Sequence, residues 1–119
     1  MAFDVYNRNC PARMVFARLA DKWSLLIIRR LSSEAVRFNQ LRRDLDGVSA
    51  KMLTQTLRNL ERDGLIQRQI FATVPVTVEY SLTELGATLA ATVDQLALWA
   101  EDNIVKVLDA QQEFDQSGQ

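Results

Sequence analysis

The sequence of 119 residues contains no histidine, a single cysteine (Cys10), 2 prolines and 4 glycines. Without histidine the chain cannot form a Cys/His zinc cluster or a Ser-His or Cys-His nucleophile pair, and one cysteine excludes an intrachain disulfide. Its apolar runs, such as Leu25–Ile28, are far shorter than the roughly 18 residues that a membrane span requires. The N-terminus has no basic region followed by an apolar stretch. These absences argue against an enzyme and against a metal, cofactor or membrane partner, and they indicate a soluble, cytoplasmic protein.

The composition, with 48% hydrophobic and 24% charged residues, is typical of a globular protein. A chain of this length buries roughly two-thirds of its extended surface on folding, which is enough for a core without a disulfide or metal. No internal repeat, low-complexity tract or linker divides the chain. We therefore expect residues 1–119 to form a single domain.

The balance of charge differs between the two parts of the chain, although the formal net charge is only −1. Residues 1–68 contain 13 of the 14 Lys and Arg residues and 7 of the 15 Asp and Glu residues. Residues 69–119 contain the remaining lysine and 8 acidic residues. This distribution suggests a basic working surface in the first part of the chain. Solvated helix faces with an accidental imbalance explain the charge alone equally well.

Capping residues and apolar spacing predict four helices in the first part. Pro11 is favoured in the first turn of a helix, and Asp21 can cap a second helix. The turn dipeptide Asp46-Gly47 precedes Ser49, an N-cap residue, and the following helix ends at the signal Asp63-Gly64. The predicted elements are a helix at 11–20, a helix at 22–31, an extended segment at 36–38, a helix at 39–45, and a helix between Ser49 and Gly64.

After Gly64 the chain becomes rich in β-branched and aromatic residues, which predicts a hairpin. Thr83 can then cap a long helix whose apolar residues recur at spacings of three and four. The last residues are polar, and we expect them to fray. The predicted elements are strands at 65–71 and 76–82, a connection at 72–75, a helix at 84–110 and a frayed tail at 111–119.

The predicted order of short strand, helix, turn, helix and hairpin is that of a winged helix-turn-helix, an α+β fold. In this fold the second helix of the pair enters the major groove of DNA. At 100° per residue, the helix after Ser49 has an apolar side and an opposite polar stripe about 60° wide. No acidic residue interrupts the stripe. The apolar side consists of Ala50, Leu53, Leu57 and Leu60, and the polar stripe of Lys51, Gln55, Arg58 and Arg62.

These side-chain types suit the recognition of DNA. Lys and Arg neutralise phosphates, Arg can bind guanine through two hydrogen bonds, and Gln can bind adenine. Ser49, Thr54 and the free N–H groups at the helix start can hold phosphate oxygens. A solvated helix face is the alternative explanation of the stripe. The preceding elements can add contacts to the DNA backbone from Arg37, Asn39, Arg42 and Arg43.

Five segments carry further motifs: Cys10-Pro11, 19–31 (LADKWSLLIIRRL), 37–41 (RFNQL), 47–68 (GVSAKMLTQTLRNLERDGLIQR) and 78–86 (VEYSLTELG). In this order they resemble the HxlR-type branch of the MarR-like winged-helix transcription regulators, over the span from Cys10 to Glu101. The resemblance implies a homodimeric bacterial repressor or activator that binds a pseudo-palindromic operator in double-stranded DNA. It also implies that Arg37 and Asn39 start the supporting helix. The recognition helix would then carry Ser49, Lys51, Thr54, Gln55 and Arg58.

The chain departs from the family pattern at two places. Asp21 stands where the family commonly has a small residue, often glycine, which affects the helix cap. The hairpin tip at 73–77 has no Lys or Arg, although a wing usually offers a cation to the minor groove or the phosphates. We therefore expect DNA affinity to depend on the two helices.

Cys10 stands before a helix start and between Arg8 and Arg13. Both the helix dipole and nearby positive charge favour a thiolate, which oxidises more easily. The resemblance implies a sensor of oxidants or electrophiles at this position, acting through an intersubunit disulfide or a reversible adduct. The alternative is a reduced thiol that serves as a small buried residue or cap.

The predicted last helix is apolar on more than one side, more than a small domain can bury alone. We expect it to pack with the first helix against a second subunit, which would place two recognition helices about 34 Å apart. Core packing within one protomer is the alternative. Phe16 and Trp99 can line a pocket for a small-molecule effector, or belong to the core. The predicted dimer contacts are Met14, Val15, Leu89, Val93, Leu96 and Trp99.

The sequence thus predicts a dimeric DNA-binding transcription regulator without catalytic activity. The alternative is a winged-helix module that binds another protein and has no sequence-specific DNA binding. The dependence of DNA affinity on salt separates the two, because contacts to phosphates give a steep negative slope.

Overall fold

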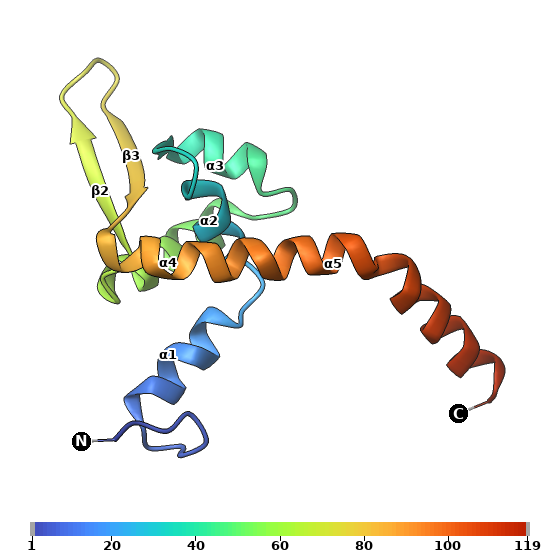
Figure 1. Cartoon of the computed structure of the whole chain (residues 1–119). Coiled ribbons are helices and arrows are strands. Elements are labelled where there is room, and N and C mark those ends of the chain that lie inside the picture. The colour runs from blue at the N-terminus through green and yellow to red at the C-terminus, as the bar shows by residue number, and fades with distance from the viewer. Residues whose placement is uncertain (1, 119) are drawn as a thin grey trace.

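A computed structural model describes residues 2–118 of the chain, which form five helices and a three-stranded sheet (Figure 1). The order of elements is helix, helix, short strand, helix, helix, hairpin and long helix, so the predicted α+β winged-helix fold is confirmed. The elements are α1 (Pro11–Leu19), α2 (Ser24–Leu31), β1 (Val36–Arg37), α3 (Phe38–Asp44), α4 (Ala50–Arg62), β2 (Ile66–Phe71), β3 (Thr77–Leu82) and α5 (Glu84–Gln116).

The main difference from the predicted elements is the length of α5. The helix continues to Gln116, so the expected end at residue 110 and the frayed tail are wrong for residues 111–116, while Gln119 lies outside the described residues. Residues 111–116 include glutamine and glutamate and no proline or glycine, so nothing in the backbone stops a helix that is already nucleated. The helix ends where Gly118 adopts a positive φ of 77°.

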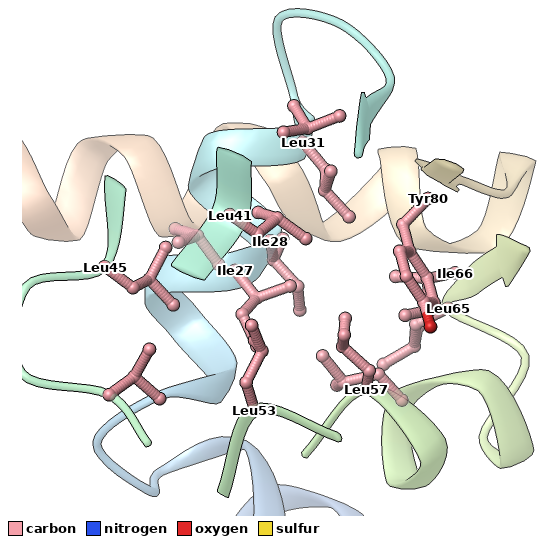
Figure 2. Packing of buried hydrophobic residues seen from close by; sticks show 14 residues of the cluster. Ile27, Ile28, Leu31, Leu41, Leu45, Leu53, Leu57, Leu65, Ile66 and Tyr80 are labelled. Atoms are coloured by element: carbon pink, nitrogen blue, oxygen red, sulfur yellow. The ribbon is translucent and has the colours of Figure 1, made fainter. Parts of the chain in front are cut away.

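The core lies between α2, α3, α4 and the sheet. Leu53 and Leu57 of α4 are 0% and 1% exposed, and Figure 2 shows them pointing toward Ile27 and Ile28 of α2. Tyr80 closes the core from the sheet. Each fully buried aliphatic side chain contributes about 1.5–3 kcal/mol, so this cluster fixes the side of α4 that faces inward.

The sheet has the order β1-β3-β2, and both pairs of strands are antiparallel. The hairpin register pairs Ile66 with Leu82 and Phe71 with Thr77. The sequence predicted the hairpin, but it gave no pairing partner for the short extended segment before α3. In the structure Val36 of β1 pairs with Tyr80 of β3, which ties the start of α3 to the wing.

A compact junction connects the end of α4 to the start of α5. The N–H of Gly64, which has a φ of 78°, donates to the Glu61 carbonyl, and the N–H of Leu65 donates to the Leu60 carbonyl. These two bonds form the Schellman motif that commonly ends a helix. The Thr83 hydroxyl donates to the Gly64 carbonyl at 2.6 Å and accepts from the N–H of Gly86 at 3.0 Å.

Helices α1 and α5 extend beyond the core (Figure 1). None of the 9 residues of α1 is buried, and the only buried residues of α5 are Gly86 and Val93. Within the described residues, no helix combines the length and the apolar character that a membrane crossing needs.

Candidate nucleic-acid interface

The start of α4 is fixed by its cap. The Ser49 hydroxyl accepts a hydrogen bond from the N–H of Met52 at 3.1 Å, and Ser49 has the extended backbone of an N-cap residue. The first N–H groups of a helix have no partner within the helix, and one of them is satisfied in this way. The cap sets where α4 begins and thereby which side chains face outward.

The outer side of α4 carries the polar side chains that the sequence predicted there. The predicted inward residues Leu53, Leu57 and Leu60 are all 1% exposed or less, and Ala50 is half-buried. The helical spacing places the opposite residues on one outer face. The exposed polar residues of α4 are Lys51, Thr54, Gln55, Arg58 and Arg62.

The two acidic residues at the end of α4 are engaged by arginines. Glu61 lies 3.7 Å from Nε of Arg68 on β2, and both carboxylate oxygens of Asp63 contact Nη1 of Arg18 on α1. No carboxylate within residues 2–118 forms an ion pair with the three basic side chains on the outer face of α4. The positive charge of this face is therefore uncompensated.

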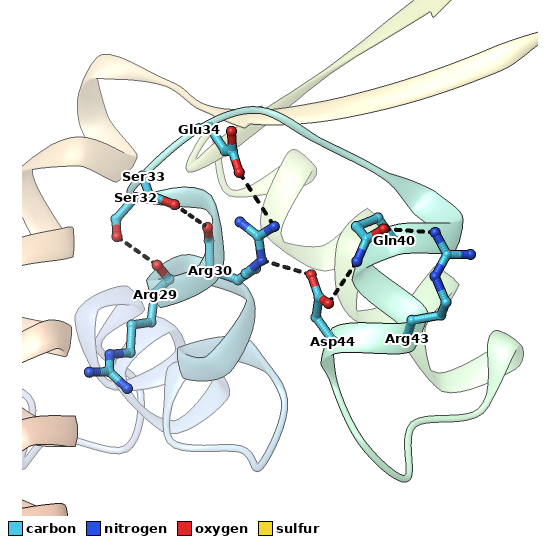
Figure 3. A network of polar contacts seen from close by, with 8 residues as sticks. All are labelled: Arg29, Arg30, Ser32, Ser33, Glu34, Gln40, Arg43 and Asp44. Carbon is cyan, nitrogen blue, oxygen red and sulfur yellow. Dashed lines mark hydrogen bonds and ion pairs between the residues drawn. The ribbon is translucent and has the colours of Figure 1, made fainter.

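Helix α3 carries its cations beside a polar network, shown in Figure 3. The Arg30 Nε donates to Asp44 at 2.8 Å, and the Gln40 amide donates to the other Asp44 oxygen at 2.8 Å. The Arg30 guanidinium, followed by the Gln40 amide, lowers the pKa of the Asp44 carboxyl. Gln40 also accepts a hydrogen bond from Arg43 at 2.7 Å. Arg30 thus neutralises Asp44, and Gln40 orients Arg43.

Four predicted backbone-contacting residues lie on or next to α3. Arg37 is the N-cap residue of the helix, Asn39 lies in its first turn, and Arg42 and Arg43 lie in its last turn. All four are exposed. None of these three arginines forms an ion pair with an acidic residue in the described part of the chain.

An open groove of about 770 Å³ separates the start of α3 from the wing. Arg37, Asn39 and Arg43 line it together with Pro75 and Val76 of the hairpin. The predicted residues of α4 do not line this groove. The predicted site residues therefore form one group between α3 and the wing and another on the outer face of α4, while Arg42 lies on α3 outside the groove.

The wing tip is apolar, as its sequence implied. The exposed fraction is 102% for Val74, 63% for Val76 and 61% for Ile70. The Thr73 hydroxyl donates to the Pro75 carbonyl at 2.7 Å and lies 3.2 Å from the Thr77 hydroxyl. These contacts within the turn hold the tip without any charged group.

Sequence reasoning missed Gln40 and Met52. The spacing of Gln40 to Arg43 and Asp44, three and four residues on, is the signal that would have indicated the network. Met52 is 43% exposed in the first turn of α4, although methionine is usually buried. No simple pattern indicates this exposure, because Met52 lies between the apolar side and the polar stripe of the helix.

Cys10 is the N-cap residue of α1, with 8% of its surface exposed. Its Sγ accepts the N–H of Asp4 at 3.3 Å. Burial raises the pKa of the thiol, but hydrogen bonds from the backbone N–H groups of Asp4, Ala12 and Arg13 lower it, and the net pKa lies below the ordinary 9.0. The direction agrees with the expectation. The responsible groups are backbone amides, while the Arg13 guanidinium donates to the Tyr6 carbonyl instead.

Only some of the predicted dimer contacts are exposed at the surface of the protomer. Met14 is 58%, Leu96 54% and Trp99 59% exposed, and Val15 is 36% exposed. Val93 is 4% exposed and belongs to the core of the protomer, which leaves little of its surface for contact with a second subunit.

Val93 is buried because the first half of α5 packs on α2 and the sheet. The inner apolar side of this helix is therefore occupied within the protomer. Leu89 is half-buried and packs against the same core. The exposed fraction of Phe16 is 63%, so Phe16 and Trp99 both lie at the surface. In residues 2–118, no group of three or more His, Cys, Asp or Glu side chains is placed to hold a metal ion.

Known proteins match this chain over most of its length. The sequence model of a family described as HxlR-like helix-turn-helix matches residues 18–107. The HTH-type transcriptional regulator YtfH of Escherichia coli (strain K12) is 41% identical over 110 residues, which cover 92% of this chain and 87% of that protein.

Solved structures give the same result. The transcriptional regulator YtfH from Salmonella typhimurium is 42% identical, with a TM-score of 0.87, and the match covers 94% of this chain and 99% of that one. The redox regulator HypR in its oxidized form is 38% identical, with a TM-score of 0.73, and the match covers 79% of this chain and 97% of that one.

Proposed function

Since the chain belongs to the HxlR-like helix-turn-helix family of transcriptional regulators, we propose that it binds a pseudo-palindromic DNA operator as a homodimer. As a regulator with a winged-helix fold it is not an enzyme. Helix α4 enters the major groove, and α3 and the wing lie along the DNA backbone. A protein that binds chromosomal DNA in this way works in the cytoplasm of a bacterium.

One observation carries the proposal: six exposed basic side chains on and beside α3 and α4 have no carboxylate partner within residues 2–118. Four other arginines, Arg18, Arg29, Arg30 and Arg68, are all paired with acids. Unpaired cations lose little when they move from water to phosphate, because no existing ion pair must break. The six residues, called the basic face below, are Arg37, Arg42, Arg43, Lys51, Arg58 and Arg62.

The residues of the interface have different roles. Arg58 and Gln55 lie in the middle of the α4 stripe, and their fork-shaped and amide groups suit guanine and adenine edges. Arg42 and Arg43 on α3 suit phosphates, which position the protein without reading sequence. Ser49, Thr54 and Asn39 add neutral hydrogen bonds to the backbone. Replacing Arg58 should therefore reduce the preference for the operator, and replacing Arg42 should weaken binding to all DNA.

The homodimer is supported by apolar surface on α1 and on the second half of α5. Exposed fractions are 63% for Phe16, 59% for Trp99, 66% for Val105 and 53% for Leu108. A monomer rarely exposes so many large apolar side chains on helices that extend beyond its core. A two-fold axis at this surface would place the same patch of each protomer against the other.

Selection of bound fragments from random duplex DNA tests the operator. We expect an enriched inverted repeat whose half-site centres lie about 10 base pairs apart, or a multiple of that distance. A scrambled duplex of equal length is the control. Equal affinity for both duplexes, with little dependence on salt, would instead support a module that binds protein.

Sedimentation of the purified protein at micromolar concentration tests the homodimer. We expect a dimer for the wild type and a monomer for Leu108→Glu, because the buried charge would have no partner in the interface. Glu113→Gln, an exposed change on the same helix, is expected to leave the dimer intact. A wild-type monomer at all concentrations would contradict the proposal.

We also infer that Cys10 responds to oxidants. Its lowered pKa increases the thiolate fraction, and HypR, a similar protein, is described as a redox regulator. Because the thiol is only 8% exposed and accepts the N–H of Asp4, the segment around Asp4 must move before a bulky oxidant can reach it. With one cysteine per chain, two Cys10 thiols can join two protomers, and the oxidant takes up two electrons and two protons.

Nonreducing electrophoresis after treatment with diamide tests this role. We expect a covalent dimer from the wild type and none from Cys10→Ser. The operator affinity of the wild type should change on oxidation, while that of Cys10→Ser should not. A wild-type affinity that is the same before and after oxidation would leave Cys10 as a buried structural thiol.

A further inference from the structure

One partly buried contact connects α1 to the end of α4. Nη1 of Arg18 lies 2.5 Å from Oδ1 and 2.6 Å from Oδ2 of Asp63. The side chains are 25% and 11% exposed, so the pair is largely removed from water. Charge-assisted hydrogen bonds of this kind are short and directional. The contact therefore holds two helices that lie 45 residues apart in the chain.

Asp63 occupies a junction of three helices. It is the C-cap residue of α4, and the next two residues close the helix through the bonds from Gly64 and Leu65. The hydroxyl of Thr83, the N-cap of α5, donates to the Gly64 carbonyl, and the N–H of Thr83 donates to the Leu65 carbonyl at 3.1 Å. Residues 63–65 are thus held by α1 on one side and by α5 on the other.

Helix α1 has few other attachments to the core. None of its residues is buried, and in Figure 1 it leads away from the rest of the protomer. Leu19, its last residue, packs partly against the core. The contact of Arg18 with Asp63 is the only ion pair that α1 forms within residues 2–118. The orientation of α1 relative to α4 therefore depends strongly on this pair.

We propose that Arg18 and Asp63 are positioning residues that set the distance between the two recognition helices of the dimer. The proposal rests on the proposed function, in which α1 belongs to the dimer interface and α4 reads DNA. Neither side chain is placed to contact DNA, because Arg18 is occupied by Asp63 and a carboxylate repels phosphate. Their role is to transmit the geometry of the interface to α4.

Because α4 is long, a small rotation at its Asp63 end causes a large displacement at its Ser49 end. With 13 residues, the helix is about 20 Å long. A rotation of about 10° of the core, which carries α4, relative to α1 about the Asp63 end moves the Ser49 end of α4 by about 3.5 Å, close to the 3.4 Å rise of one base pair. An ion pair that limits such rotation therefore determines which half-site spacing the dimer accepts.

The test compares spacings of one selected operator. Three duplexes carry the half-sites at the selected spacing, one base pair closer, and one base pair further apart. We expect the wild type to bind the selected spacing about tenfold more tightly than the other two. Arg18→Gln should bind all three within about threefold, while it remains a dimer in sedimentation. A loss of stability alone would lower all three affinities together and keep their ratio.

Lys106→Gln is the matched control for Arg18→Gln, because it removes the same charge from an exposed position on α5. This variant should keep the wild-type ratio of affinities for the three duplexes. Asp63→Asn removes the negative charge of the same ion pair and should also lose the preference for the selected spacing. If Asp63→Asn does not fold, Arg18→Gln still decides, because α1 has no buried residue.

If folded Arg18→Gln keeps the wild-type ratio of affinities for the three duplexes, the proposal is wrong. If the wild type itself shows no preference for any selected duplex, the proposed function fails instead of the positioning role.

Discussion

The uncompensated charge of α3 predicts how DNA binding depends on salt. Arg42 is exposed and has no acidic partner in the described residues, and it lies in the last turn of α3. The substitution Arg42→Gln removes its charge and keeps a polar side chain of similar shape. It should weaken binding to operator and to random DNA by the same factor, because a phosphate contact reads no base.

The size of the effect follows from the release of counterions. Each neutralised phosphate contributes about −0.9 to the slope of log affinity against log salt. Six residues of the basic face in each protomer set a ceiling of about −11 for a dimer. Arg42→Gln removes two of these contacts per dimer and should make the slope about 1.8 less steep. Between 50 and 200 mM salt, the affinity of the variant should therefore fall about 12-fold less than that of the wild type.

Fluorescence anisotropy with a labelled operator at four or five salt concentrations measures both slopes. Lys106→Gln provides the control, because Lys106 is an exposed residue of α5 and the change in net charge is the same. Its slope should equal that of the wild type. The reasoning is refuted if Arg42→Gln keeps the wild-type slope, or if Lys106→Gln changes the slope by as much.

Three further predictions concern the core, the wing and the thiol. Leu57→Ala should lower the free energy of unfolding, measured in urea, by about 2–5 kcal/mol because Leu57 is 1% exposed. Met52→Ala, at a position 43% exposed, should change this free energy far less. Similar losses in the two variants would be inconsistent with this packing. Val74→Lys should make the salt slope about 1.8 steeper, and an unchanged slope would mean that the wing tip does not reach the DNA. Alkylation of Cys10 by iodoacetamide should show a midpoint below pH 9.0 in the folded protein and a higher one in urea, since unfolding removes the backbone N–H donors; equal midpoints would contradict the pKa shift.

Local patterns predicted the elements that build the interface. The turn before Ser49, the apolar spacing of Leu53, Leu57 and Leu60, and the glycine at position 64 all act within a few residues. For this reason α4, its outer face and the hairpin could be located from the sequence. The fold followed from the order of these elements, and the family resemblance agreed with it.

Contacts between distant parts of the chain could not be predicted in the same way. Nothing near Asp63 indicates that Arg18 binds it, and nothing near Val36 indicates that it pairs with Tyr80. Val93 belongs to an apolar helix face that looks suited to either a core or an interface, and only packing against α2 and the sheet decides between them. The polar residues at 111–116 are compatible with a frayed end as well as with a helix, although they propagate a helix well, so the sequence does not show that α5 continues to Gln116.

The length of α5 also affects how the molecule approaches DNA. The helix of 33 residues reaches about 50 Å, and its last sixteen residues, 101–116, contain five acidic residues and one lysine. In Figure 1 this end projects away from α3 and α4. In the proposed complex DNA would repel the acidic end and attract the basic face, so its field would turn the protein before the surfaces touch. The acidic end of α5 would then raise the fraction of collisions that begin in the productive orientation.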